Sequence, residues 1–193
     1  MMMDFKELNN IKLKIVQVGD PVLRTVARSL TKDEILNTAT QQFISSMINT
    51  LRDAPGVGLA APQVGISLQI AVIEDREEYI NLLKPEDIKE RDRRPVPFHV
   101  IINPKLTLLE VENQAHFYEG CLSLSGFVGK VPRALKVFVT ALNEKAEVVN
   151  IEAQGWYARI LQHEIDHLNG TLHIDRMNMK MLTTVENYKK YHG

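Results

Sequence analysis

The sequence predicts an α+β protein in which antiparallel β-sheets pack around one central helix, with a further helix near the N-terminus. Three observations predict this class. Short apolar segments bounded by turn residues are typical of strands. Such segments occur both before and after the central helix. They do not alternate regularly with helices, as the strands of a parallel sheet would. The chain has 193 residues, 45% of them hydrophobic. This size and composition predict a single domain over residues 1–193.

The charge balance excludes some classes of partner. A net charge of -1 gives no long-range attraction to nucleic acid or anionic membranes, so we expect no direct binding to either. No apolar run approaches the roughly 18 residues of a membrane span, and residues 1–10 lack the pattern of a secretory signal. The single cysteine, Cys121, favours a reducing compartment. We expect a cytoplasmic protein, or a mitochondrial or plastid one if a transit segment has been removed.

The first half of the chain contains one strand pattern and one strong helix pattern. Residues 11–18 alternate apolar side chains with lysines, which predicts a short edge strand. Thr31 and Glu34 have the spacing of a capping box, and apolar residues recur behind them at intervals of four. This pattern predicts one helix over about residues 32–52. The mixed charges of residues 75–94 predict a solvated excursion without chemistry.

The second half contains most of the predicted strands. Asn103 and Pro104 are expected to separate two of them, and residues 143–145 to turn a hairpin. The central helix begins at Gly155 and ends at Asn169, before a glycine. The predicted strands cover residues 68–73, 98–102, 105–112, 134–142 and 147–152.

The central helix carries the residues typical of a metal site. His163 and His167 lie four residues apart, so both imidazoles can face one metal ion from the same side of the helix. Glu164 lies at the edge of that side, where it could act as a base. Because this pattern also occurs by chance in ordinary helices, a catalytic site requires a third ligand elsewhere in the chain.

Two further segments supply candidates for such a site. A lone cysteine is usually a small buried hydrophobe. Together with two imidazoles, however, Cys121 would make three protein ligands and leave a fourth position open, as in catalytic sites. Residues 56–65 are rich in glycine and alanine, with Gln63 as the one polar donor. This segment is either a simple turn or a place where the backbone approaches a ligand, and it lacks the lysine and hydroxyl of a phosphate loop.

Three short blocks together resemble the signature blocks of the peptide deformylases, in order and at the expected separations. They are GVGLAAPQ at residues 56–63, EGCLS at residues 119–123 and QHEIDH at residues 162–167. The resemblance extends from residue 19 to about residue 177. Residues 155–159 and the charged segment 75–94 are similar to the mitochondrial-type branch of that family.

The resemblance implies hydrolysis of the formyl group from N-formylmethionyl nascent polypeptides, with release of formate. It implies that Cys121, His163 and His167 hold one divalent metal ion, iron(II) in the native protein, with zinc, nickel or cobalt as substitutes. Hydroxide formed on the metal would attack the formyl carbon, with Glu164 as general base and then general acid. Nascent chains would be the partners, with transient proximity to the ribosome, and the protein would be a monomer or a homodimer.

The resemblance also assigns the residues around the substrate. The Gln63 amide and the Leu122 backbone N–H would stabilise the oxyanion. The Gly58 backbone would pair with the peptide as a strand. The methionine side chain would lie between Val57 and Trp156. The residues that would bind the substrate are Val57, Gly58, Gly120 and Trp156.

Two alternatives remain open from the sequence. Residues 163–173 also satisfy the longer H-E-x-x-H-x-x-G-x-x-H pattern of metzincin proteases, in which His173 would be the third ligand of a zinc endopeptidase. That interpretation gives the other two blocks no role. In the second alternative, the metal only stabilises the fold, although three ligands beside a glutamate favour an open coordination position.

Overall fold

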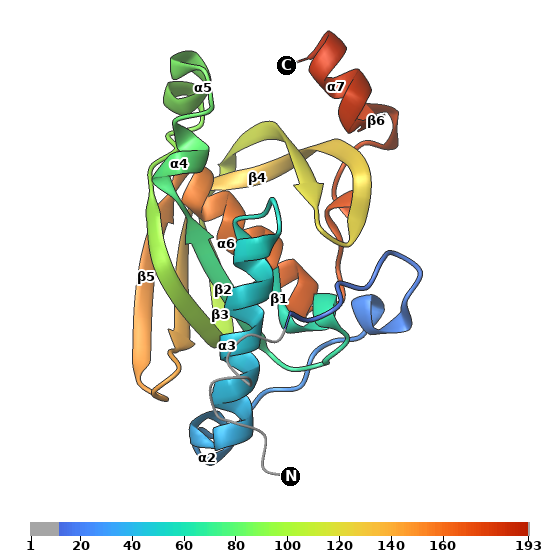
Figure 1. The fold of residues 1–193 in the computed structure, drawn as a ribbon. Coiled ribbons are helices and arrows are strands. Elements are labelled where there is room, and N and C mark those ends of the chain that lie inside the picture. Colours follow the sequence, from blue (N-terminus) through green and yellow to red (C-terminus); the bar gives the residue numbers. More distant parts are fainter. Residues whose placement is uncertain (1–11, 193) are drawn as a thin grey trace.

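The computed structural model describes residues 12–192 (Figure 1). The strand predicted over residues 11–18 is wrong for residues 12–18, which belong to no strand, and residue 11 lies outside the described part. Instead, single hydrogen bonds hold this segment, from Val16 N–H to the Gln63 carbonyl at 2.9 Å and from Val18 N–H to the Ser123 carbonyl at 2.8 Å. Within residues 12–192, every helix is too short or too polar to cross a lipid bilayer.

One continuous antiparallel sheet forms the framework, where the sequence predicted more than one sheet. Five strands pair in the order β1-β2-β3-β4-β5, and β6 pairs with β4. The combination of this sheet with several helices confirms the α+β class. The strands are β1 Gly58–Ala60, β2 Ile70–Asp75, β3 Val96–Cys121, β4 Leu124–Leu142, β5 Val148–Gln154 and β6 Leu182–Thr184.

The third strand is longer than the sequence indicated. The predicted strands at residues 98–102 and 105–112 are both parts of β3. Asn103 has a positive φ of 51°, and the register with β4 shifts between Ile102 and Lys105. A bulge therefore bends the strand here without ending it. The hairpin about residues 143–145 is confirmed, because β4 and β5 pair on either side of it.

The predicted helix over residues 32–52 is two helices. Asn37 has an extended backbone (φ -65°, ψ 140°), and its side chain accepts a hydrogen bond from the Ala39 N–H, so it caps a second helix. The capping box of Thr31 and Glu34 is confirmed. The central helix, α6, runs from Gly155 to Leu168 as predicted. The other helices are α2 Lys32–Leu36, α3 Thr38–Asp53, α4 Glu77–Ile80, α5 Pro85–Glu90, α7 Val185–Tyr191 and the short 3-10 helices η1 Pro21–Arg24, η2 Ala61–Val64, η3 His173–Asp175 and η4 Met179–Met181.

Helices α3 and α6 cover opposite faces of the first three strands (Figure 1). Along β2, Ile70 and Val72 pack with the α3 cluster, whereas Ala71 and Ile73 pack with the α6 cluster. Successive side chains of a strand point to opposite faces, so a strand covered on both sides is apolar throughout. Helix α6 is thereby fixed against the sheet.

The segment over residues 75–94 is not a fully solvated excursion. Asp75 is completely buried, and Arg93 donates two hydrogen bonds of 2.8 Å to its carboxylate. Between these residues lie α4 and α5. The prediction of a solvated segment is wrong at both ends, because the charges of Asp75 and Arg93 neutralise each other in the interior.

Candidate metal centre

Three side chains converge between the end of β3 and the C-terminal half of α6. The ligand atoms of Cys121, His163 and His167 all lie within 4.8 Å of one another, and Cys121 Sγ is 3.3 Å from His167 Nε2. A thiolate and two imidazoles at this spacing suit a divalent transition metal with an open fourth position. Burial and the neighbouring His163 hold the pKa of His167 well below its ordinary value, which keeps His167 in the neutral form that binds metals.

A buried carboxylate orients one of the two histidines. Glu119 Oε2 lies 2.9 Å from His163 Nδ1, which leaves the other ring nitrogen to face the cysteine. Burial alone would raise the pKa of Glu119, but hydrogen bonds from His163 and Arg133 outweigh it and hold that pKa well below the ordinary value. The carboxylate is therefore charged. Such a partner fixes the tautomer and the ring orientation of a metal-binding histidine.

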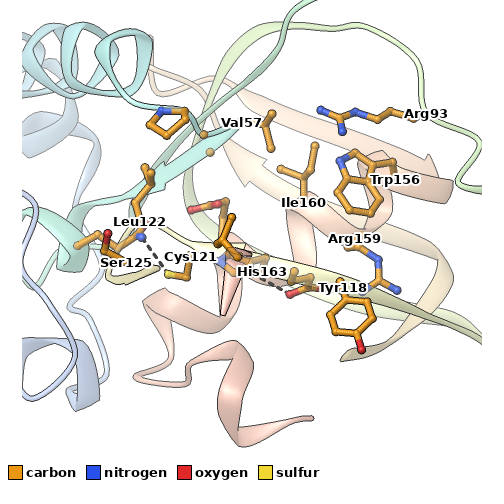
Figure 2. Close-up of a pocket in the computed structure, with 18 of the residues that line it drawn as sticks. Val57, Arg93, Tyr118, Cys121, Leu122, Ser125, Trp156, Arg159, Ile160 and His163 are labelled. Atoms are coloured by element: carbon orange, nitrogen blue, oxygen red, sulfur yellow. Dashed lines mark hydrogen bonds and ion pairs between the residues drawn. The ribbon is translucent and has the colours of Figure 1, made fainter. Parts of the chain in front are cut away.

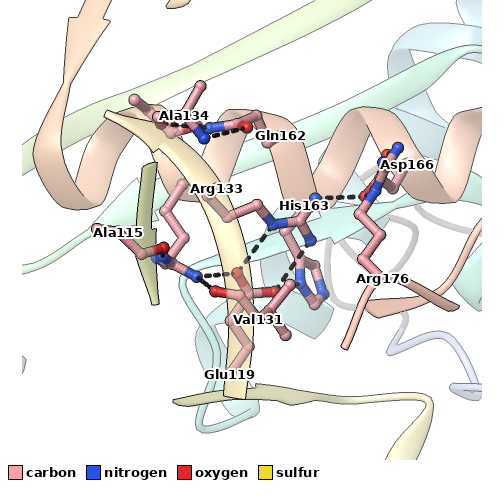
Figure 3. Close-up of polar contacts among 11 residues, drawn as sticks. Ala115, Glu119, Val131, Arg133, Ala134, Gln162, His163, Asp166 and Arg176 are labelled. Carbon is pink, nitrogen blue, oxygen red and sulfur yellow. Dashed lines mark hydrogen bonds and ion pairs between the residues drawn. The ribbon is translucent and has the colours of Figure 1, made fainter. Parts of the chain in front are cut away.

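An ion-pair network surrounds this carboxylate (Figure 3). Arg133 donates two hydrogen bonds of 3.0 Å to Glu119 and one of 2.5 Å to Asp166. Arg159 donates to Glu119 at 2.6 Å and to the Ala115 carbonyl at 2.7 Å. Sequence reasoning missed all four charged residues. The only indication was the position of Glu119 and Asp166 inside two of the three blocks.

Glu164 lies buried beside the metal ligands with a free oxygen. Its Oε2 has no hydrogen-bond partner among the described residues, and burial raises its pKa to about 7. A Cβ atom at Gly58 would lie only 2.3 Å from Glu164 Oε1, so residue 58 must be glycine for the carboxylate to occupy this position. Within residues 12–192, β1 pairs only with β2, so the other edge of Gly58 is open to a further strand.

The Gln63 amide is fixed in orientation. Its Oε1 accepts a hydrogen bond of 2.9 Å from the Ala60 N–H, while its Nε2 lies 3.5 Å from Cys121 Sγ and 3.4 Å from Ser123 Oγ. Only 1% of Gln63 is exposed. The donor therefore faces the metal ligands, which favours a role at the site over the alternative of a simple turn.

A cavity of about 450 Å³ opens beside these residues (Figure 2). This volume lies in the range of small-ligand sites. His167 is the one predicted site residue that does not line it. Ten further lining residues were not assigned to the site from the sequence: Pro55, Gly56, Arg93, Tyr118, Glu119, Ser125, Gly126, Arg159, Ile160 and Val185. The predicted residues that line it are Val57, Gly58, Gln63, Gly120, Cys121, Leu122, Trp156, His163 and Glu164.

His173, the third ligand of the metzincin alternative, does not belong to the converging group. It is 1% exposed, and its ring stacks on His163 with the centroids 5.7 Å apart. Burial lowers its pKa to about 4, so it is a neutral packing partner. The structure thus places Cys121, and not His173, where a third ligand is required.

These features define a class of protein: an α+β protein in which one cysteine and two histidines converge next to a buried glutamate, a donor set that suits metal-dependent hydrolases. The chain belongs to the polypeptide deformylase family, whose model matches residues 12–182.

Named relatives agree with this assignment. "Peptide deformylase 1A, chloroplastic" of Solanum lycopersicum is 48% identical over 173 residues, which are 90% of this chain and 62% of the tomato protein. "Peptide deformylase, mitochondrial" of Homo sapiens is 37% identical over 171 residues, 89% of this chain and 70% of the human one. The solved class I type b peptide deformylase from Acinetobacter baumannii with bound Met-Ala-Ser has a TM-score of 0.76 and 31% identity, and covers 87% of this chain and 99% of its own. The chain thus spans less than two thirds of the tomato relative.

Proposed function

We propose that the chain is a peptide deformylase that hydrolyses the N-formyl group of N-formylmethionyl nascent polypeptides and releases formate. One observation carries this proposal: the ligand atoms of Cys121, His163 and His167 converge beside Glu164 in an open cavity. The family membership supports it, and the Acinetobacter baumannii relative was solved with Met-Ala-Ser.

One divalent metal ion would be held by Cys121, His163 and His167, and we propose iron(II) as the native ion, with zinc, nickel or cobalt as substitutes. The bound metal would supply Lewis acidity, which lowers the pKa of water and polarises a carbonyl oxygen. The thiolate and imidazole donors found here suit this set of metals.

Glu164 would transfer the protons. Its Oε2 has no partner among the described residues and is free to accept a proton from the attacking water. A carboxylate whose pKa is near 7 can also return that proton to the leaving amine at neutral pH. The Gln63 Nε2 and the Leu122 backbone N–H would donate hydrogen bonds to the formyl oxygen as it becomes negative.

The peptide would lie along the open edge of β1. Gly58 would pair with its backbone, Val57 and Trp156 would flank the methionine side chain, and Gly120 would also contact the peptide. All four residues line the same cavity as the proposed metal ligand Cys121. This arrangement gives each part of a formylmethionyl chain a partner.

We further propose that residues 1–193 form one catalytic domain that acts as a monomer or homodimer wherever formylated chains are made, in a bacterial cytoplasm or inside an organelle. Relatives named as chloroplastic, mitochondrial and bacterial proteins support this range. Transient proximity to a ribosome would follow from a substrate that is still being synthesised.

The proposal is tested with formyl-Met-Ala-Ser and acetyl-Met-Ala-Ser. The formylated peptide should be hydrolysed far faster, because the acetyl group brings a methyl group to a place beside the metal where only hydrogen need fit. Equal rates would instead indicate a general amidohydrolase. Enzyme loaded with iron(II) should lose activity in air faster than enzyme loaded with nickel, since both iron and its thiolate ligand can be oxidised. Equal lifetimes would count against iron(II) as the native metal.

A further inference from the structure

A short strap near the N-terminus holds both segments that carry the proposed oxyanion donors. This strap is residues 16–18, which belong to no strand. The Val16 N–H donates to the Gln63 carbonyl at 2.9 Å, and the Val18 N–H donates to the Ser123 carbonyl at 2.8 Å. Gln63 lies in η2, whereas Ser123 lies in the turn between β3 and β4. The strap therefore connects two segments whose bonded residues are 60 positions apart in the chain.

Between these two backbone contacts, the Gln17 side chain forms two hydrogen bonds with the same turn. Its Nε2 donates to the Leu122 carbonyl at 3.0 Å, and its Oε1 accepts from the Ser125 N–H at 3.2 Å. Leu122 and Ser125 lie beside Cys121, at the end of the cavity away from Trp156 (Figure 2). A side-chain amide offers its donor and its acceptor in one plane, so Gln17 can bind both groups only when the turn keeps one shape.

The turn lacks the backbone conformation that is usual for a two-residue hairpin loop. Cys121 pairs with Leu124, which leaves Leu122 and Ser123 as the two central residues. Such loops favour turns in which the first central residue has a positive φ, and neither residue has one here. The register between β3 and β4 also shifts beside the turn, between Gly120 and Cys121. Strand pairing by itself therefore does not fix the direction of the Leu122 N–H.

We infer that Gln17 is a positioning residue: it fixes the turn so that the Leu122 N–H and Gln63 Nε2 donate to the same formyl oxygen. The inference rests on the proposed deformylase function. Oxyanion donors are effective only within hydrogen-bond reach of the place where the negative charge develops. Gln17 is exposed and does not line the cavity, so it would act through the turn and not by contact with the substrate.

The test compares Gln17→Met with Gln17→Glu on formyl-Met-Ala-Ser. The first substitution keeps the length of the side chain and removes both hydrogen bonds. The second keeps an acceptor for the Ser125 N–H but loses the donor to Leu122. Both should lower kcat by about 3- to 30-fold, less than the roughly 10²- to 10³-fold expected for loss of a whole donor, because the Leu122 N–H remains but is less well directed. KM and metal content should be unchanged.

Lys12→Met is the matched control on the same segment. Lys12 forms an ion pair of 2.6 Å with Asp53, in which both side chains are more than half exposed, and its loss should leave kcat unchanged. Amide hydrogen exchange in the zinc form gives a readout independent of activity. The Ser125 N–H should exchange faster in Gln17→Met, and it should stay protected in Gln17→Glu and in Lys12→Met.

Several outcomes would overturn the inference while leaving the deformylase function standing. They are an unchanged kcat in Gln17→Met, an effect confined to KM, a loss of metal, or an equal loss of kcat in Lys12→Met. A normal kcat in Gln17→Glu would also overturn it, because the contact with Leu122 would then have no effect. A wild-type chain that cannot hydrolyse formyl-Met-Ala-Ser would overturn the proposed function itself.

Discussion

The two ends of the cavity are built from different kinds of contact. At the metal end, Glu119 and Arg133 are buried charges that form several hydrogen bonds with defined lengths. At the far end, Trp156 and Tyr118 are held mainly by ring packing, with ring centroids 6.4 Å apart between Trp156 and Phe117 and 4.8 Å apart between Tyr118 and Tyr188. The metal end fixes atoms in position, whereas the far end mainly presents an apolar surface.

This difference follows from what each end must do. Proton transfer and metal binding require positions correct to a few tenths of an ångström, which directional hydrogen bonds provide. Binding of an apolar substrate side chain depends mainly on burial, which is non-directional. Arg159 links the two ends, because it donates to Glu119 at 2.6 Å and its guanidinium lies 5.8 Å from the centre of the Trp156 ring. We therefore expect substitutions at the metal end to affect kcat and those at the far end to affect KM.

The largest effect is expected from the third ligand. Cys121→Ala should abolish metal retention and deformylation, because two imidazoles alone bind a metal weakly. His173→Ala should leave the metal content nearly intact, since His173 only stacks on His163. Metal analysis of both purified variants tests this. The cobalt form should also show an intense near-ultraviolet band from the thiolate ligand. The metzincin alternative would be restored if that band were absent and metal were lost only in His173→Ala.

Removal of the proton-transfer group should have the next largest effect. Glu164→Ala and the isosteric Glu164→Gln should each lower kcat by about 10²- to 10⁴-fold, the usual contribution of a general acid–base. Metal should stay near one equivalent, because Glu164 is not part of the converging ligand group. Metal content and kcat are measured on the same preparation. If both fall together, Glu164 is structural.

The donor at Gln63 should matter somewhat less. Gln63→Leu should lower kcat by about 10²- to 10³-fold, as expected for one oxyanion donor. It should also reduce the free energy of unfolding by about 1–3 kcal/mol, because the buried Ala60 N–H loses its acceptor. Ser123→Ala is the control: it removes the other neighbour of Nε2, at 3.4 Å, but keeps the donor. An unchanged kcat in Gln63→Leu would mean that residues 56–65 are a structural turn.

Two of the three candidate metal ligands share a local pattern that the sequence shows directly. Helical spacing relates His163 to His167, and the position of Gln63 in a segment of small residues marks it as the donor. The break at Asn37 was missed because the apolar spacing of four continues across it, although asparagine is a common cap.

The ion pairs and the far end of the cavity could not be predicted from local patterns. Glu119 and Arg133 face each other only because β3 and β4 pair in one particular register, and Asp75 meets Arg93, which lies 18 positions further along the chain. In a sequence, such charges look like ordinary surface residues. Val185 reaches the cavity through the pairing of β6 with β4, which has no sequence pattern of its own.

The smallest effect on catalysis is expected from the buried ion pair near Trp156. Asp75→Asn leaves the Arg93 guanidinium buried without a counter-charge, so the free energy of unfolding should fall by about 3–5 kcal/mol. The matched control is Glu74→Gln on the same strand: its partner Arg52 is 48% exposed, and the cost should be at most about 1 kcal/mol. Denaturant unfolding measures both. Arg93 lines the far end and contacts Trp156. Asp75→Asn should therefore raise KM a few-fold and leave metal content and kcat unchanged. A loss of metal would show that the two ends are not independent.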